Sequence, residues 1–170
     1  MLPKNIRDIG GGLVSLVEDG AIAHWNDVVP GIWTGPYTLT QVGSYISKLC
    51  EPGPGIYRLI GLDDANMPAV LNRLLGQDHT GTLYIGCEGK NFAVRSRLTK
   101  LVRSLRDYRY NDEHGAGYRL RSHPILSQRF PKSRLAITWH YTNECKLAED
   151  CLLDAYFTSF GDLPPLNWRK

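Results

Sequence analysis

GIYRLIG (55–61) and TLYIG (82–86) are the two apolar stretches that decide the fold of this chain. Both are rich in β-branched and aromatic residues, so each predicts a strand. Each also places a tyrosine beside a glycine, as Gly-Ile-Tyr in the first and Tyr-Ile-Gly in the second. The segment EPGPG (51–55) leads into the first stretch, and its prolines and glycines end any helix that precedes it.

Three helices and one more strand are predicted around these two stretches. Residues 63–81 predict a short helix, and residues 91–108 predict a longer one because their apolar side chains recur at a spacing of 3.6 residues. RLAITWHYT (134–142) predicts a third strand, and 144–160 predict a last helix that ends at Gly161. This order of elements predicts a small α/β sandwich.

Residues 1–52 form an N-terminal extension in this interpretation, and residues 53–170 form the main domain. The extension contains a loop, VVPGIWTGPY (28–37), and a helix predicted over 38–50 with a threonine cap at Thr38 or Thr40. Its aromatic side chains would be costly to leave exposed. We therefore expect the extension to select the substrate or a partner.

The formal net charge of +3 hides a strong asymmetry along the chain. Residues 90–134 hold twelve of the twenty Lys and Arg but only three acidic residues, so this segment carries +9 and the rest of the chain −6. A basic block of this kind indicates a polyanionic partner, or else a solvated face that acids balance in space.

The cysteines and the hydropathy bear on the compartment. Cys50, Cys87, Cys145 and Cys151 show no CxxC spacing and no zinc-like pattern, so we expect free thiols in a reducing cytoplasm. No stretch has the length of uncharged apolar sequence that a membrane span needs. The sequence therefore predicts a cytoplasmic protein without a membrane partner.

Glu149 is the acidic residue with the most unusual predicted setting. It shares one face of the last helix with the apolar residues Leu153, Tyr156 and Phe160. A carboxylate on an apolar stripe is costly unless a cation or hydrogen bonds compensate it. It is either a metal ligand or a glutamate in a salt bridge at the rim of the core.

Taken together, "GIY" (55–57), "YIG" (84–86), an arginine on the next helix, a glutamate on the last helix and a terminal "PPLN" (164–167) resemble the GIY-YIG nuclease superfamily. The resemblance covers roughly residues 53–168. It implies a central three-stranded, mostly antiparallel sheet flanked by helices. It also implies a metal-dependent endonuclease with Mg²⁺, or Mn²⁺, as cofactor and nucleic acid as partner, with DNA preferred over RNA.

The resemblance also implies a set of site residues. Arg97 is chosen over Arg95 because aliphatic residues surround it as they do the arginine of the family. Many members place a histidine or tyrosine one turn after that arginine, where this chain has Leu101; His114 supplies a polar group to the site instead, or merely orders its glycine-rich loop. The implied catalytic set is Tyr57, Tyr84, Arg97, His114, Glu149 and Asn167.

Each residue of the set has a chemical reason to be there. Hydrolysis of a phosphodiester needs an activated water and stabilisation of the charge that develops on the phosphoryl oxygens. Glu149 would hold the metal, and Arg97 would bind a non-bridging oxygen. Tyr57 or Tyr84 would position or deprotonate the water, with a pKa lowered by the arginine and the metal. Asn167 would brace the site.

The basic segment supplies the expected contacts to the phosphate backbone. These contacts are assigned to Lys90, Arg95, Lys100, Arg103, Arg119 and Arg121. One active site cuts one strand, so a double-strand break would need a homodimer, a cognate protein partner or two successive events. Two alternatives stay open, namely a non-catalytic nucleic-acid-binding module on the same fold and a structural protein with coincidental motifs.

Overall fold

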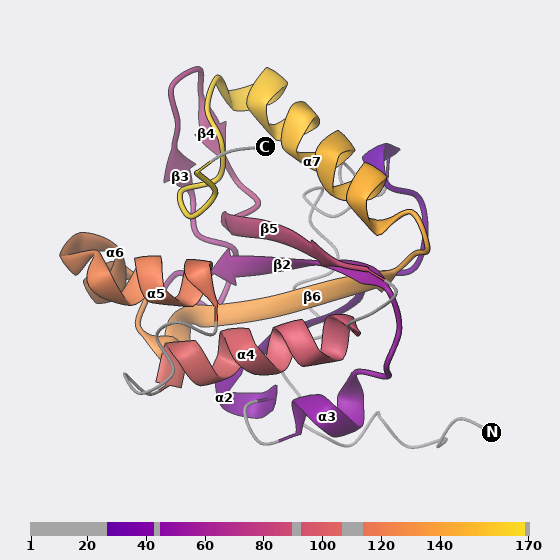
Figure 1. Cartoon of the computed structure of the whole chain (residues 1–170). Coiled ribbons are helices and arrows are strands. Elements are labelled where there is room, and N and C mark those ends of the chain that lie inside the picture. Colours follow the sequence, from indigo (N-terminus) through magenta and orange to yellow (C-terminus); the bar gives the residue numbers. More distant parts are fainter. Residues whose placement is uncertain (1–26, 43–44, 90–92, 107–113, 169–170) are drawn as a thin grey trace.

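The four longer strands form one antiparallel sheet at the centre of the molecule (Figure 1). The computed structural model describes residues 27–42, 45–89, 93–106 and 114–168. The strands are β1 (Thr34–Thr38), β2 (Gly55–Gly61), β5 (Thr82–Glu88) and β6 (Leu135–Tyr141), in the spatial order β1-β6-β2-β5. The α/β class and the three strands predicted from the sequence are confirmed. Every residue of β2 is buried, as expected of a central strand with both faces covered.

The sheet has four strands, so the expected count of three is wrong. The additional strand, β1, lies within the segment assigned to the N-terminal extension and pairs with β6, with Thr34 opposite Trp139 and Thr38 opposite Ala136. The glycine and proline of TGPYT favoured a loop. They are tolerated in β1 because it is an edge strand whose register shifts between Thr34 and Tyr37.

The helix predicted over 38–50 is described as two short helices, α2 (Leu39–Val42) and α3 (Ile46–Leu49). The predicted cap at Thr38 is confirmed, because the Gln41 amide donates to Thr38 Oγ1 (3.4 Å) and the Thr38 amide donates to Gln41 Oε1 (3.1 Å). This reciprocal pair is a capping box. Both helices bury apolar side chains in the same core as Tyr57 of β2.

The prediction of a helix over 63–81 is wrong. The chain forms a β-hairpin there from β3 (Leu71–Asn72) and β4 (Gln77–Asp78). The reason is tertiary. The buried carboxylate of Asp78 accepts hydrogen bonds from the Thr80 amide (2.7 Å), the Thr82 amide (3.1 Å) and the Tyr156 hydroxyl (2.9 Å). These bonds join the hairpin to β5 and to the last helix, and they outweigh a local helical preference.

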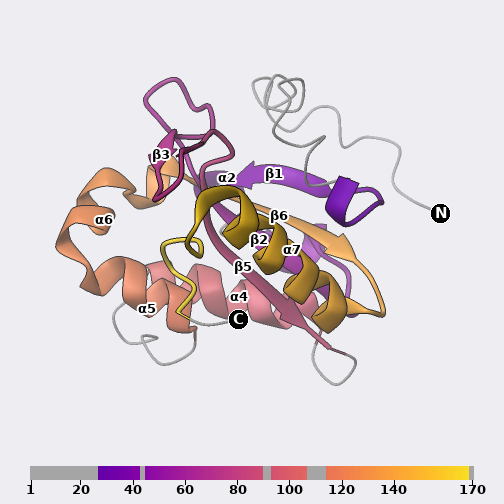
Figure 2. The same ribbon diagram turned by 90° about the horizontal axis from the view of Figure 1, so that it is seen from above.

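Helices cover both faces of the sheet (Figures 1 and 2). On one face lies α4 (Val94–Arg106), which with α2, α3 and α5 (Gly115–Ser122) encloses Tyr57 and Leu59. On the other face α7 (Cys145–Phe160) packs on Ile56 and Ile85. The two helices predicted over 91–108 and 144–160 are confirmed, and α7 ends at Gly161 in the left-handed conformation (φ 76°).

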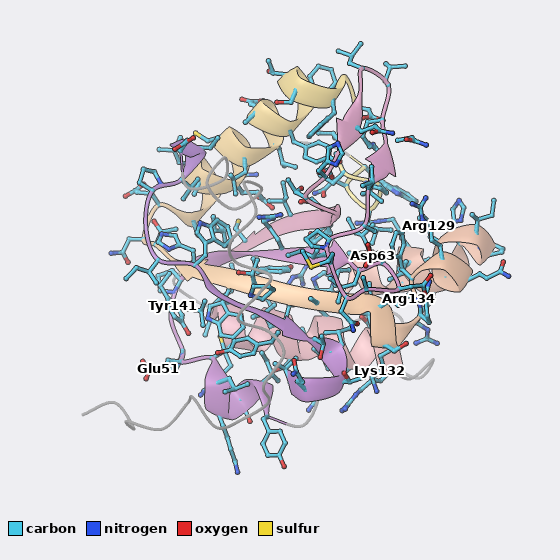
Figure 3. All side chains as sticks on the ribbon, turned by 180° about the vertical axis from the view of Figure 1, so that it is seen from behind. Glu51, Asp63, Arg129, Lys132, Arg134 and Tyr141 are labelled. Carbon is cyan, nitrogen blue, oxygen red and sulfur yellow. The ribbon has the colours of Figure 1, made fainter. Side chains whose placement is uncertain are left out.

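The remaining elements are α6 (Pro124–Arg129) and the 3-10 helix η3 (Lys132–Arg134), which precede β6. At the opposite end of the molecule the Glu51 amide donates to the Tyr141 hydroxyl at 2.7 Å, which fixes the entry into β2 against the end of β6 (Figure 3). Within the described ranges, no helix is both long and apolar enough to span a bilayer.

Candidate active site

The glycines of the two tripeptides are explained by close contacts within the fold. A Cβ on Gly55 would lie 2.5 Å from the carbonyl oxygen of His140 on the neighbouring strand β6. A Cβ on Gly86 would lie 2.6–2.8 Å from ring atoms of Tyr84 and Tyr57 and from the Tyr57 hydroxyl. Protein atoms occupy the space that each missing Cβ leaves, so the packing of the fold accounts for glycine at both positions.

Three aromatic rings gather where the two tripeptides meet. The ring centroids of Tyr57 and Tyr84 are 5.9 Å apart, and that of His114 lies 6.0 Å from the first and 5.6 Å from the second. The Tyr57 hydroxyl is 2.7 Å from His114 Nε2. Tyr57 and His114 are buried, whereas Tyr84 lines an open cleft. The structure therefore brings His114 to the two tyrosines, while Leu101 is buried in the core.

His114 reaches this place because α5 packs very closely on α4. A Cβ on Gly117 would lie 1.8 Å from the Ser104 hydroxyl, so only glycine permits this helix contact. Arg121, assigned to the nucleic-acid contacts, donates from Nη1 to the Ser104 carbonyl at 2.6 Å and so joins the two helices. His114 is the residue directly before α5, and its position follows from this packing.

The buried imidazole of His114 is neutral. Burial, together with the charges of Arg97, Arg119 and Lys100, lowers its pKa from 6.5 to about 3. Its Nδ1 is buried and has no hydrogen-bond partner among the described residues. A buried N–H without a partner costs more than a buried lone pair, so the proton belongs on Nε2, which donates it to the Tyr57 oxygen.

Both tyrosines hold their protons more tightly than a free tyrosine. Burial raises the pKa of Tyr57 well above 10, and the nearby Tyr84 adds to the effect. Burial also raises the pKa of Tyr84, helped by the negative charge of Glu149. Arg97 opposes the shift in both cases but is outweighed. Arg97 thus lowers both pKa values, as expected, but desolvation is the larger effect in the protein without metal.

Arg97, and not Arg95, is the arginine that acts on the tyrosines. Burial lowers the pKa of Arg97, but interactions with Tyr57, Tyr84 and Glu88 outweigh burial and raise it. Its Nε lies 3.9 Å from a carboxylate oxygen of Glu88. Arg95 instead lies near Cys50, whose thiol pKa its charge helps to lower against the effect of burial. The choice of Arg97 agrees with this arrangement.

Glu149 points into a cleft of about 530 Å³ between α7 and the C-terminal segment. The lining residues are Tyr84, Arg119, Lys146, Glu149, Leu153, Asn167 and Trp168. The Glu149 side chain is only 15% exposed, and its Oε2 accepts from Lys146 Nζ (2.9 Å) and from the Cys87 thiol (3.2 Å). No described residue donates to Oε1, so one oxygen of this cleft-lining carboxylate has no hydrogen-bond donor among them.

These residues fit a divalent cation held by one carboxylate. Within the described part of the chain no group of three or more His, Cys, Asp or Glu side chains converges as a metal cage. Mg²⁺ commonly takes one carboxylate and fills its other positions with water and substrate phosphate, which Oε1 of Glu149 allows. The competing cation is Lys146, whose side chain is 64% exposed and is also paired with Asp150 at 2.8 Å.

Asn167 is committed to the backbone of β5. Its Oδ1 accepts from the Ile85 amide (3.0 Å) and its Nδ2 donates to the Ile85 carbonyl (2.8 Å). The side chain thus pairs with the free backbone N–H and C=O of Ile85 at the edge strand β5, as another strand would. Asn167 therefore fixes the C-terminal segment to β5, with Trp168, the residue after it, at the cleft.

The basic residues assigned to the phosphate backbone occupy different surroundings. Arg95, Lys100 and Arg103 lie along α4, Arg119 lines the cleft, and Lys90 lies outside the described residues. Further along the segment, Arg129, Lys132 and Arg134 gather at one end of the molecule (Figure 3). Arg134 is paired there with Asp64, and Arg129 donates to the Val70 carbonyl at 2.9 Å.

Three residues at the site were missed by the sequence analysis, namely Lys146 and Trp168, which line the cleft, and Cys87, which donates to Glu149. Two of them carried a readable signal. Cys87 lies two residues after Ile85 on β5, and strand alternation puts both on the face covered by α7. Lys146 precedes Glu149 by one helical turn. Nothing in the local pattern marked Trp168.

Comparison with known protein families, curated proteins and solved structures gave no match to this chain. The interpretation of the site therefore depends on its own geometry and on the resemblance of its motifs.

Proposed function

We propose that this chain is a metal-dependent endonuclease of the GIY-YIG type that hydrolyses phosphodiester bonds in nucleic acid, with DNA as the preferred substrate. The observation that carries the proposal is the convergence of chemically suitable groups from distant parts of the chain. Tyr84, Glu149 and Asn167 line one cleft, while Tyr57 and His114 pack directly behind Tyr84. Arg97 acts on both tyrosines.

Each group has a distinct role in the proposed reaction. A bound divalent cation would neutralise charge on the scissile phosphate and make an attacking water more acidic. Glu149 would hold the cation through Oε1, and Arg97 would stabilise charge on the phosphoryl oxygens. Tyr84 is the tyrosine in the cleft, so it orients the attacking water. Its raised pKa suits a hydrogen-bonding role better than proton abstraction in the metal-free protein.

Tyr57 and His114 act behind Tyr84. The neutral His114 donates from Nε2 to the Tyr57 oxygen, and this leaves the Tyr57 hydroxyl proton free to donate toward Tyr84. A side-chain hydrogen bond joins Tyr57 and Tyr84. The relay holds the oxygen of Tyr84 in one orientation, which is the preorganisation that such catalysis needs.

The second candidate is a nucleic-acid-binding module without catalysis. The specific observation in its favour is the ion pair between Lys146 and Glu149, which places a protein cation at the carboxylate expected to hold the metal. In this alternative Lys146 substitutes for the metal permanently.

Free cysteines at all four positions suit a cytoplasmic location for either candidate.

Nicking of supercoiled plasmid with Mg²⁺ or with EDTA tests the proposal. The wild-type protein should nick the plasmid only with the metal, and Glu149→Gln should abolish nicking while leaving plasmid binding intact. Asp150→Asn is the matched control, since Asp150 shares the Lys146 partner but is 46% exposed. Lys146→Ala should lower the Mg²⁺ concentration required for half-maximal nicking. Nicking by Glu149→Gln at the wild-type rate would overturn the assignment.

A further inference from the structure

Trp168 is the most exposed large aromatic side chain among the described residues, with 77% of its surface accessible. It lies at the cleft that also holds Glu149 and Tyr84. By contrast, Trp139 and Tyr156 are buried in the two cores. Transfer of an indole out of water lowers the free energy. An exposed indole beside the cleft therefore indicates a surface that a ligand covers.

The position of Trp168 is fixed by its neighbours. The Leu166 amide donates to the Leu83 carbonyl at 2.9 Å, and both polar ends of the Asn167 side chain bond to the backbone of β5. The guanidinium of Arg119 lies over the indole, 5.0 Å from the ring centroid, and donates from Nε to the Leu166 carbonyl at 2.8 Å. One face of the ring is therefore supported by a cation, and the ring is preorganised before any ligand binds.

The charges around this ring suit a nucleotide. Arg119 and Lys146 line the same cleft, so a phosphate there would meet two cations, of which Lys146 is also paired with Glu149 and Asp150. A flat aromatic surface beside phosphate-binding cations is the usual combination for holding an unpaired base, because stacking needs only the π-face that every base has. A paired base in a duplex has both faces stacked on its neighbours and offers none to Trp168.

We propose that Trp168 is a stacking platform for an unpaired nucleobase, so that the substrate is single-stranded or carries unpaired nucleotides beside the cleaved phosphate. This inference rests on the proposed function and narrows its substrate class. Trp168 is a specificity-determining residue in this arrangement. Arg119 is a positioning residue that holds the indole ready.

The test compares binding of one single-stranded DNA oligonucleotide with binding of its duplex, using the full chain in EDTA so that no cleavage occurs. Trp168→Ala should weaken single-strand binding by about fivefold to a hundredfold and leave duplex binding nearly unchanged. Trp168→Phe should keep most of the wild-type affinity for the single strand. Tyr118→Ala is the matched control, because Tyr118 is an aromatic residue of α5 that is 47% exposed but does not line the cleft.

A second readout is the tryptophan fluorescence of the protein. Single-stranded DNA should quench it in the wild type and in Tyr118→Ala, and much less in Trp168→Phe, because the stacked indole is then absent. If Trp168→Ala lost affinity for both DNAs equally, or lost none, the stacking inference would be overturned and the proposed function would stand. If the wild-type protein binds neither DNA at low salt, the proposed function fails with it.

Discussion

The hydroxyl oxygen of Tyr57 lies 2.7 Å from Nε2 of His114, and both side chains are almost completely removed from solvent. The pair joins the first signature strand to a residue 57 positions later in the chain. Because the imidazole is buried beside three cationic side chains, it stays neutral where a free histidine would take up a proton. The pair is therefore both part of the proposed site and a source of pH-dependent stability.

His114→Gln should remove that dependence on pH. The folded-state pKa of about 3 is below the unfolded value of 6.5, so the unfolded state binds the extra proton between these values. The contribution of neutral His114 is complete above pH 6.5 and is lost as the pH falls toward 3. Below pH 6 the free energy of unfolding of the wild type should fall faster than that of the variant, by about 1.4 kcal/mol per pH unit.

Urea unfolding at several pH values between 7.5 and 4.5 measures this difference. The groups facing His114 are Tyr57, Tyr84, Arg97, Arg119 and Lys100. Because these neighbours are common to both proteins, the difference between the two stability curves reports the residue at position 114. Parallel stability curves for wild type and variant would show that His114 is not buried in its neutral form.

Arg97→Ala should reduce nicking by about a hundredfold to a thousandfold, because it removes a preorganised charge next to the tyrosines. Arg95→Ala should reduce nicking only a few fold, because the charge of Arg95 acts on the Cys50 thiol, whereas that of Arg97 acts on both tyrosines. Both residues lie on the first turns of α4, which makes the two variants a matched pair. Plasmid nicking rates at saturating Mg²⁺ give the ranking, and a larger loss for Arg95→Ala would reverse the assignment.

Gly86→Ala should destabilise the fold by about 1–3 kcal/mol and misplace both tyrosines, because its Cβ would lie within 2.8 Å of their rings. Gly76→Ala is the control, since a Cβ there would meet no atom within 4 Å. Urea midpoints of the two variants report stability, and nicking rates report the site. A Gly86→Ala protein as stable and as active as Gly76→Ala would mean that the rings do not occupy this space.

Leu39→Ala should cost about 2–5 kcal/mol, because this leucine is fully buried in the core that also holds Tyr57. Ile32→Ala should change stability very little, because Ile32 is 87% exposed in the same N-terminal part of the chain. Thermal unfolding of both variants gives the comparison. If residues 1–52 were only an accessory that selects substrate, the two substitutions would have equally small effects on the stability of the fold.

The sequence predicted the elements whose own residues determine them. The spacing of Val94, Leu98 and Leu101 defined α4, and Gly161 marked the end of α7, because these signals are local. The hairpin at 71–78 was missed because the buried Asp78 obtains its partners from β5 and α7. Strand β1 was missed because its partner β6 lies about a hundred residues away, with Thr34 opposite Trp139.

The same distinction applies to the site. The resemblance of motifs assigned Tyr84, Arg97 and Glu149 to the site. Tyr84 and Glu149 line the cleft, and Arg97 acts on Tyr84. The protonation of the tyrosines could not be predicted from residue types, because it depends on how deeply each ring is buried. Trp168 gave no signal either, since only the folded chain shows an exposed indole resting on Arg119.

The position of β6 in the middle of the sheet has a consequence for biosynthesis. A ribosome makes β1, β2 and β5 well before β6, yet β6 is the strand that pairs with both β1 and β2. The nascent chain therefore carries strands with unpaired edges until residue 141 has emerged, and pairing over such distances is slow. We expect slower translation, lower growth temperature or chaperones to raise the yield of native protein. We also expect the proposed nuclease to remain inactive until the residues up to Asn167 have been made.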